Sequence, residues 1–121
     1  MTHDPLASDG AMAERERRLG LNEAVFRQVN EQISQLVERF QQTPQELDLV
    51  CECGDPSCTK RISMPMSDYE QVRADPLQFA IVPGHDDRAV EVVIARERTY
   101  NLVRKRGEAA ALAAQSDPRD E

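Results

Sequence analysis

The feature that most constrains this chain is the segment "CECGDPSCTKRI", residues 51–62. It contains all three cysteines of the 121-residue sequence: Cys51, Cys53 and Cys58. An odd, clustered set of this kind indicates either a disulfide with a leftover thiol or metal ligands whose last partner lies elsewhere in the chain. Small domains bury a small share of their surface, so either cross-link would contribute strongly to stability.

The rest of the composition favours the metal. No segment has the roughly 20 consecutive apolar residues that cross a bilayer, and the opening "MTHDPLASDG" lacks the layout of a signal peptide. We therefore expect a cytoplasmic protein, in which persistent disulfides are rare. The formal net charge of -7 argues against unspecific binding to nucleic acid or to anionic membranes.

The spacing of the cysteines is typical of a zinc knuckle. Zinc takes four ligands in a tetrahedron and prefers thiolates and imidazoles. The stretch "LDLVCEC" alternates as a strand does, so Cys51 and Cys53 direct their sulfurs to one side. The turn at residues 54–56 can then bring Cys58 to the same point. We predict a Zn2+ cofactor; the alternatives are free thiols in a packed turn or a redox pair of two cysteines.

The fourth ligand must come from outside the knuckle. Of the two histidines, His3 lies in a predicted tail, whereas His85 follows a predicted strand in "VPGHDD". We predict that His85 completes the site; an exposed loop histidine, or replacement by water or by a carboxylate such as Asp86, are the alternatives. A structural zinc contributes on the order of 10 kcal/mol to folding, so metal removal should unfold much of the protein.

A long amphipathic helix is predicted over residues 11–42. It is either continuous with a weak point at Gly20, or frayed at its start and firm from Asn22 to about Gln41. Its apolar side chains recur at helical intervals and form one stripe. In the favoured interpretation the stripe packs on the domain's own sheet; in the alternative it forms a seam with a partner or a second copy. The candidate partner-binding residues are Leu19, Phe26, Val29, Ile33, Leu36 and Phe40.

Five short strands are predicted after this helix. They cover residues 47–53, 61–66, 77–82, 89–95 and 99–105, and a short helix capped by Ser67 separates the second from the third. This order favours an α+β fold, with the long N-terminal helix packed on a small, mainly antiparallel sheet that carries the knuckle.

The expected organisation along the chain has four parts. Residues 1–10 form a disordered tail and residues 11–42 the amphipathic helix. Residues 43–107 form the zinc-stabilised α+β region, and residues 108–121 a marginal helix with a disordered end.

Two resemblances follow from these motifs. Cys51, Cys53 and Cys58, with glycine after the second cysteine, resemble the post-SET zinc knuckle beside histone methyltransferase domains, where a cysteine of the catalytic domain completes the tetrahedron. This resemblance covers the knuckle alone and implies no methyltransferase activity. Over a longer span, "FRQVNEQI", "VCECGDPSCTKRISM" and "YEQVRADPLQFAIVPGH" resemble short, functionally uncharacterised bacterial proteins with a Cys-Glu-Cys knuckle and a Pro-Gly-His turn. That resemblance implies pairing of the knuckle with His85 and supplies no activity.

The sequence carries no clear catalytic motif. A catalytic zinc keeps one position open for water, and three thiolates on the metal weaken its effect on the acidity of that water. No Gly-rich loop that could cradle phosphate is present either. We therefore expect a protein that is not an enzyme.

One basic segment is conspicuous in this acidic chain. Residues 96–106 contain five basic side chains against Glu97, a local charge of 5 - 1 = +4. Such a ribbon could contact phosphates; alternatively it is a solvated edge strand that its charges protect from aggregation. The candidate nucleic-acid-binding residues are Arg96, Arg98, Arg104, Lys105 and Arg106.

These observations predict a small regulatory or adaptor module with structural zinc, acting through protein contacts of its N-terminal helix. A nucleic-acid-associated regulator that uses residues 96–106 is the first alternative. A redox-responsive switch, in which oxidation of the thiolates releases zinc, is the second.

Overall fold

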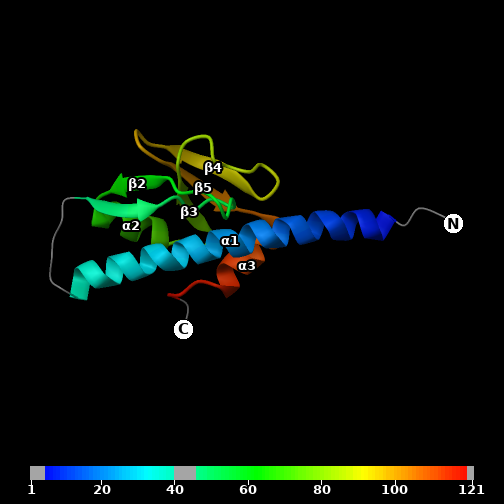
Figure 1. Cartoon of the computed structure of the whole chain (residues 1–121), viewed down its shortest axis with the longest axis horizontal. Coiled ribbons are helices and arrows are strands. Elements are labelled where there is room, and N and C mark those ends of the chain that lie inside the picture. The colour runs from blue at the N-terminus through cyan, green and yellow to red at the C-terminus, as the bar shows by residue number, and fades with distance from the viewer. Residues whose placement is uncertain (1–4, 40–45, 120–121) are drawn as a thin grey trace.

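The computed structural model describes residues 5–39 and 46–119 and has the predicted α+β architecture. A single long helix, α1, lies beneath two small sheets, with α2 at one end of the strands and α3 beside α1 (Figure 1). The elements in chain order are α1 (Pro5–Arg39), β1 (Leu47–Val50), β2 (Arg61–Met64), α2 (Met66–Arg73), β3 (Gln78–Ile81), β4 (Glu91–Arg96), β5 (Asn101–Lys105) and α3 (Gly107–Gln115).

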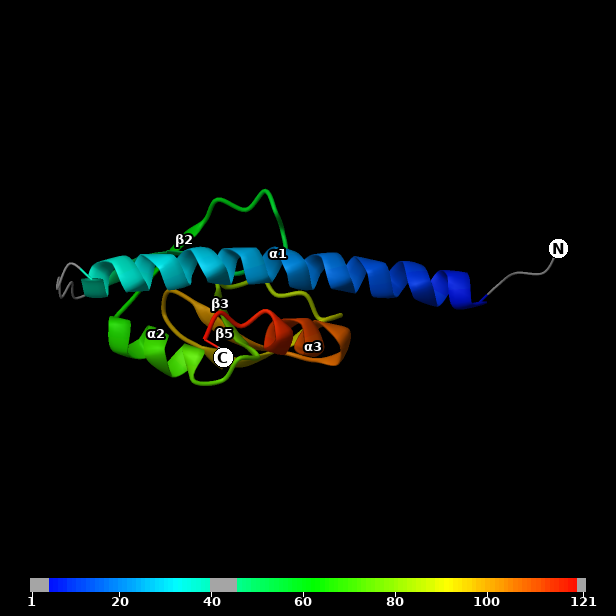
Figure 2. The same ribbon diagram turned by 90° about the horizontal axis from the view of Figure 1, so that it is seen from below.

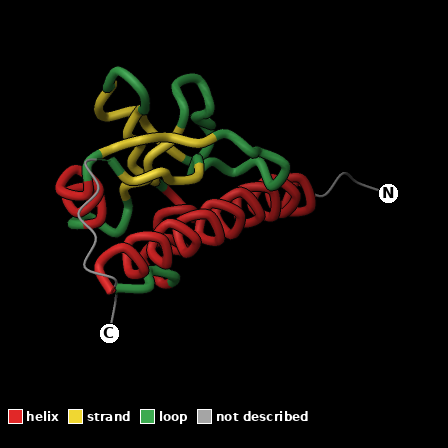
Figure 3. The backbone as a smooth tube through the Cα atoms, turned by 60° about the vertical axis from the view of Figure 1, so that its left-hand side comes forward, coloured by secondary structure: helices red, strands yellow, loops and turns green. Residues whose placement is uncertain are grey.

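The strand pairs of the described residues are all antiparallel, and the sequence predicts a mainly antiparallel sheet. β1 and β2 form a hairpin, and the other strands form a sheet in the order β3-β5-β4. The extended chain after β1 joins the two sheets, because the N–H of Glu52 donates to the carbonyl of Ala80 on β3 at 2.9 Å. Figure 3 shows the strands, in yellow, gathered on one side of the long helix.

The inward-facing side chains of the β1–β2 hairpin form one of the two clusters of the core. Leu47 and Leu49 on β1 pair with Met64 and Ile62 on β2, and all four side chains are buried. Burial of a side chain of this size contributes about 1.5 to 3 kcal/mol. Tyr69 and Val72 of α2 close this cluster, and Phe79, Ile81 and Val103 form a second cluster around the cysteines.

The most deeply buried side chains of α1 are polar, whereas the apolar stripe in the sequence predicts an apolar buried face. Of the predicted stripe, Leu19, Phe26, Val29 and Ile33 are half-buried, Leu36 is 48% exposed, and Phe40 lies outside the described residues. The residues that α1 buries most deeply are Glu23, Arg27, Asn30, Glu31 and Ser34.

The buried polar side chains of α1 are stable because hydrogen bonds and opposite charges from other elements satisfy them. Arg27 donates to the carbonyls of Pro76 and Ala113, and its guanidinium lies 4.4 Å from the centre of the Phe79 ring. Glu23 forms an ion pair with the buried Lys105 of β5, which also pairs with Glu91. The helix therefore packs on the sheet through these polar contacts as well as through Ile33 and Val37, which lie against the core cluster.

The ends of the chain differ from the predicted boundaries. α1 begins at Pro5, so residues 5–10, expected in a disordered tail, are helical; the predicted helix end at Gln42 lies outside the described residues. Its N-terminal end extends beyond the strands and α3 (Figures 1 and 2). Ser67 does not cap α2, whose first residue is Met66 and whose N-cap is Pro65.

α3 is a packed element and not the marginal helix expected from its small side chains. It lies alongside α1 in Figures 1 and 2, and it buries Ala109 and Ala113. Gly20 is the contact point on α1, since a Cβ there would lie 3.1 Å from Leu112 Cδ1. After α3, Arg119 donates to Glu31 at 2.7 Å, so the chain end through residue 119 folds back onto α1.

Candidate metal centre

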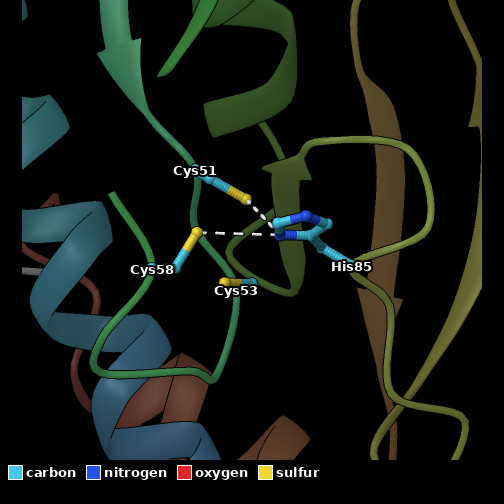
Figure 4. A group of neighbouring side chains, drawn as sticks. All are labelled: Cys51, Cys53, Cys58 and His85. Atoms are coloured by element: carbon cyan, nitrogen blue, oxygen red, sulfur yellow. Dashed lines mark hydrogen bonds between the residues drawn. The ribbon is translucent and has the colours of Figure 1, made fainter. Parts of the chain in front are cut away.

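The four predicted ligands meet at one point. The ligand atoms of Cys51, Cys53, Cys58 and His85 all lie within 4.8 Å of one another. The three thiols approach from the knuckle and the imidazole from the loop after β3, with its Nδ1 toward the sulfurs (Figure 4). A segment near residue 55 and one near residue 85 are thus brought to a single site, as the metal hypothesis requires.

Two of the distances fit a tetrahedral metal ion. His85 Nδ1 lies 3.6 Å from Cys51 Sγ and 3.6 Å from Cys58 Sγ. A tetrahedron with zinc–sulfur bonds of about 2.3 Å and zinc–nitrogen bonds of about 2.05 Å has sulfur–nitrogen edges of about 3.6 Å. The donor set and its spacing are therefore those of a site that can bind such an ion.

Local turn chemistry shapes the knuckle. The Asp55 carboxylate accepts hydrogen bonds from the N–H and hydroxyl of Ser57 at 2.9 and 2.7 Å, and these bonds lower its pKa. The N–H of Cys58 donates to the carbonyl of Asp55 at 3.1 Å and closes the turn. The "GDPSC" sequence thus folds the third thiol back toward the first two with a network that needs no distant partner.

A second turn positions His85. Its N–H donates to the carbonyl of Val82 at 3.0 Å, and Gly84 between them has φ of 90°. Proline at the second position and a glycine with positive φ at the third are the requirements of a type II turn. The Pro83-Gly84 pair therefore reverses the chain directly after β3 and places the imidazole over the knuckle.

The thiols are buried and hydrogen-bonded. The N–H of Val82 donates to Cys51 Sγ at 3.2 Å, a bond that orients the sulfur toward the site. Burial raises the pKa of the Cys51 and Cys53 thiols, so binding of a metal ion to them must release protons. Arg61, which could have favoured thiolates, instead pairs with Asp48 on the exposed side of the hairpin.

α1 packs against both the knuckle and the loop that carries His85. Asn22 donates to the carbonyl of Gly54 at 2.9 Å, and a Cβ on Gly54 would lie only 2.6 Å from Leu19 Cδ2. On the other loop, Arg15 pairs with Asp87 at 2.9 Å. Gly54 and Asp87 each lie within two residues of a predicted ligand, so the metal centre and the helix share their supporting segments.

Two residues that the sequence did not mark as functional hold this arrangement together. Asn30 of α1 accepts the N–H of Val50 at 2.8 Å and donates to Glu52 at 2.8 Å. Glu52, between the two cysteines, also accepts the N–H of Ala80 at 2.9 Å, and burial raises its pKa. Strand alternation does direct Glu52 away from the thiols, but the sequence offers no signal that Asn30 is its partner.

The predicted basic ribbon is not a single surface. Lys105 is only 2% exposed and faces Glu23 and Glu91, and Arg104 pairs with Asp75 at 3.0 Å. Tyr100, the one aromatic residue of segment 96–106 that could stack on a base, is 8% exposed. Arg96, Arg98 and Arg106 remain at the surface.

Comparison with known proteins adds no assignment. The sequence matches no protein-family model, and neither curated proteins nor solved structures show a match to the chain. Among the described residues, no helix is long and apolar enough to cross a membrane. The site's own geometry is therefore the basis for a functional hypothesis.

Proposed function

We propose that Cys51, Cys53, Cys58 and His85 hold one structural zinc ion. The observation that carries the proposal is the pair of 3.6 Å distances from His85 Nδ1 to Cys51 Sγ and Cys58 Sγ, which equal the edge of a zinc tetrahedron. Three thiolates and one imidazole form a donor set that zinc prefers. Four protein ligands fill the coordination shell, so we assign no catalysis to this centre.

Zinc at this site would cross-link three parts of the fold. It would bind the segment after β1 to the turn after β3, and both segments contact α1 through Gly54 and Asp87. Because a chain of this size has a modest core, such a link would contribute a large share of the net stability. Loss of the metal would then loosen the N-terminal half of α1 first.

We further propose a regulatory or adaptor role through protein contacts of α1. Its outer face carries Leu21, Val25 and Leu36, with exposed fractions of 41%, 60% and 48%. Exposed large apolar side chains on one helix face are typical of a contact surface. The acidic residues Glu23 and Glu31 point inward and leave this face free of their charge.

The zinc proposal is tested by metal content. Elemental analysis of the purified protein should find one zinc per chain, also in His3→Ala, which removes the other histidine. His85→Ala and Cys58→Ser should lose most of it. A wild type without zinc would contradict the proposal, and full retention in His85→Ala would remove His85 from the ligand set.

The contact proposal is tested on the outer face of α1. Val25→Glu with Leu36→Glu should abolish a concentration-dependent dimer in sedimentation, or binding of a partner once one is known. Gln71→Glu with Gln115→Glu adds the same charge to exposed positions of α2 and α3, away from this face, and is the matched control. Equal effects of the two pairs would show that charge alone matters and would contradict an apolar contact.

The redox alternative rests on the same cluster, because Cys58 is only half-buried and its sulfur is close to those of Cys51 and Cys53. Hydrogen peroxide would oxidise two thiolates to a disulfide, itself be reduced to water, and so release the metal. Zinc release by peroxide that dithiothreitol reverses would support this alternative, and retention of zinc would exclude it.

A further inference from the structure

β4 is a free edge of the three-stranded sheet. The strand order β3-β5-β4 gives β4 one neighbour, β5, and no other described strand pairs with it. In Figure 1 it lies at the side of the sheet farthest from α1. Alternate residues of an edge strand direct their backbone N–H and C=O groups away from the sheet, where another extended segment can pair with them.

The surface along this edge is grooved and partly apolar. A groove of about 340 Å³ runs beside β4, with Val92 and Val93 among its lining residues. Val92 and Ile94 are 49% and 45% exposed, which is high for large apolar side chains. An extended segment laid against β4 would cover both.

The rim of the groove is cationic. Arg88, Arg96 and Arg106 line it, and Arg98 follows in the β4–β5 turn; all four are exposed. None of them forms an ion pair with an acidic side chain of the described residues, although most other arginines of the described region do. Of the two acids in the groove, Glu91 is already bound by Lys105, which leaves Asp86 alone against three arginines.

We propose that β4 binds a short, extended, acidic peptide segment, which adds to the sheet as a further strand. The backbone edge supplies hydrogen bonds, Val92 and Ile94 supply apolar contacts, and the arginines select acidic side chains. A bulge between Val93 and Ala95 interrupts the regular ladder, so the edge suits a short segment better than open-ended sheet growth.

Other occupants fit these observations less well. A second copy would bring its own four arginines to the same seam and would add repulsion. Single-stranded nucleic acid needs exposed aromatic side chains for stacking, and Tyr100, the aromatic residue of this hairpin, is 8% exposed. This proposal does not depend on the metal centre, so its failure and that of the zinc proposal are separate results.

The test uses the purified full chain and a fluorescein-labelled peptide of four Glu-Val repeats. Fluorescence anisotropy should give saturable binding with a Kd of roughly 100 μM or tighter. A peptide of four Lys-Val repeats should not bind. The Glu-Val peptide with N-methylated backbone amides should bind at least about tenfold more weakly, because it cannot donate to a strand edge.

Variants locate the site. Arg96→Glu with Arg106→Glu should weaken binding of the Glu-Val peptide at least about tenfold. The matched control, Arg17→Glu with Arg18→Glu, makes the same charge change on exposed positions of α1 and should leave the affinity unchanged. In the wild-type protein, which needs no variant to fold, the peptide should shift the backbone amide NMR signals of residues 91–96.

Several results would overturn the proposal. They are the absence of binding at 1 mM peptide, equal binding of the N-methylated or Lys-Val peptide, and amide shifts confined to α1. A wild-type dimer that Val92→Asp dissociates would assign the edge to a second copy. Tighter binding of an oligodeoxythymidine probe that the Arg96→Glu, Arg106→Glu pair abolishes would assign the arginines to nucleic acid.

Discussion

Substitution of Gly54 by alanine tests how the knuckle meets α1. The sequence suggests that this glycine serves the turn, yet its φ is not positive; only Gly84 and Gly107 among the described glycines have positive φ. A Cβ at Gly54 would instead lie 2.6 Å from Leu19 Cδ2, 3.2 Å from Leu19 Cβ and 3.4 Å from Leu19 Cα. We infer that Gly54 is required for close approach of the helix.

The expected cost follows from these distances. Carbon atoms prefer separations of about 3.5 to 4.0 Å. Rotation of the Leu19 side chain can move Cδ2, but its Cβ and Cα belong to the helix wall, so α1 must shift. Overpacking of this kind typically costs about 1 to 3 kcal/mol, and we expect Gly54→Ala to lower the free energy of unfolding by about 2 kcal/mol.

Urea denaturation of the purified protein measures this cost in two backgrounds. In the Leu19→Gly background the contacts at 2.6 and 3.2 Å are absent and the remaining 3.4 Å separation from Cα is close to the preferred range, so the cost of Gly54→Ala should fall below about 1 kcal/mol. If the glycine served only the backbone conformation of the turn, its replacement would cost the same in both backgrounds. An equal cost, or a cost below about 0.5 kcal/mol in the wild-type background, would refute the close-approach argument.

Three further predictions concern the same framework. Asn30→Ala removes buried hydrogen bonds to Val50 and Glu52 and should lower the free energy of unfolding by about 3 kcal/mol in urea, with the exposed Gln32→Ala close to neutral. Gly84→Ala and Gly107→Ala both place alanine at positive φ and should each cost about 1 to 2 kcal/mol, but only Gly84→Ala should lower zinc affinity in a chelator competition. Burial raises the pKa of Glu91 to about 7, so below that pH its contact with Lys105 is a hydrogen bond to a neutral carboxyl, and the folded state retains a proton that the unfolded chain releases near 4.5. The stability of the wild type relative to Glu91→Gln should therefore fall as the pH rises from about 5 to 8, and a constant difference would contradict this.

The parts of the site that depend on local sequence were predictable. The three thiols are set by strand alternation and by the Asp55 turn, whose hydrogen bonds stay within four residues. The Pro83-Gly84 turn before His85 is likewise a local device. The strands also follow from local alternation, with β1, for example, carrying Leu47 and Leu49 inward and Asp48 outward.

The polar face of α1 was not predictable from the sequence. Arg27 looks like a solvated helix residue until the carbonyls of Pro76 and Ala113 are known to lie beneath it. Those acceptors come from segments far along the chain, so no local pattern reports them. The same holds for Gly20 and Gly54, which are needed because other elements pack against them and not because of their own backbone conformation.

Lys105 shows an intermediate case. The alternation of β5 places Asn101, Val103 and Lys105 on one face and Arg104 on the other. Since Val103 is an obvious core residue, the pattern alone could have shown that Lys105 points inward. A count of basic residues that ignores which face of the strand each one occupies makes the segment look like one cationic ribbon.

In the proposed metal centre, one zinc ion is bound by three cysteine sulfurs and one histidine nitrogen. X-ray absorption at the zinc edge of the purified protein measures this shell directly. We predict three sulfur scatterers at about 2.3 Å and one nitrogen at about 2.0 to 2.1 Å, with the nitrogen lost in His85→Ala. A shell with fewer than three sulfurs, or one unchanged in His85→Ala, would contradict zinc binding by these four ligands.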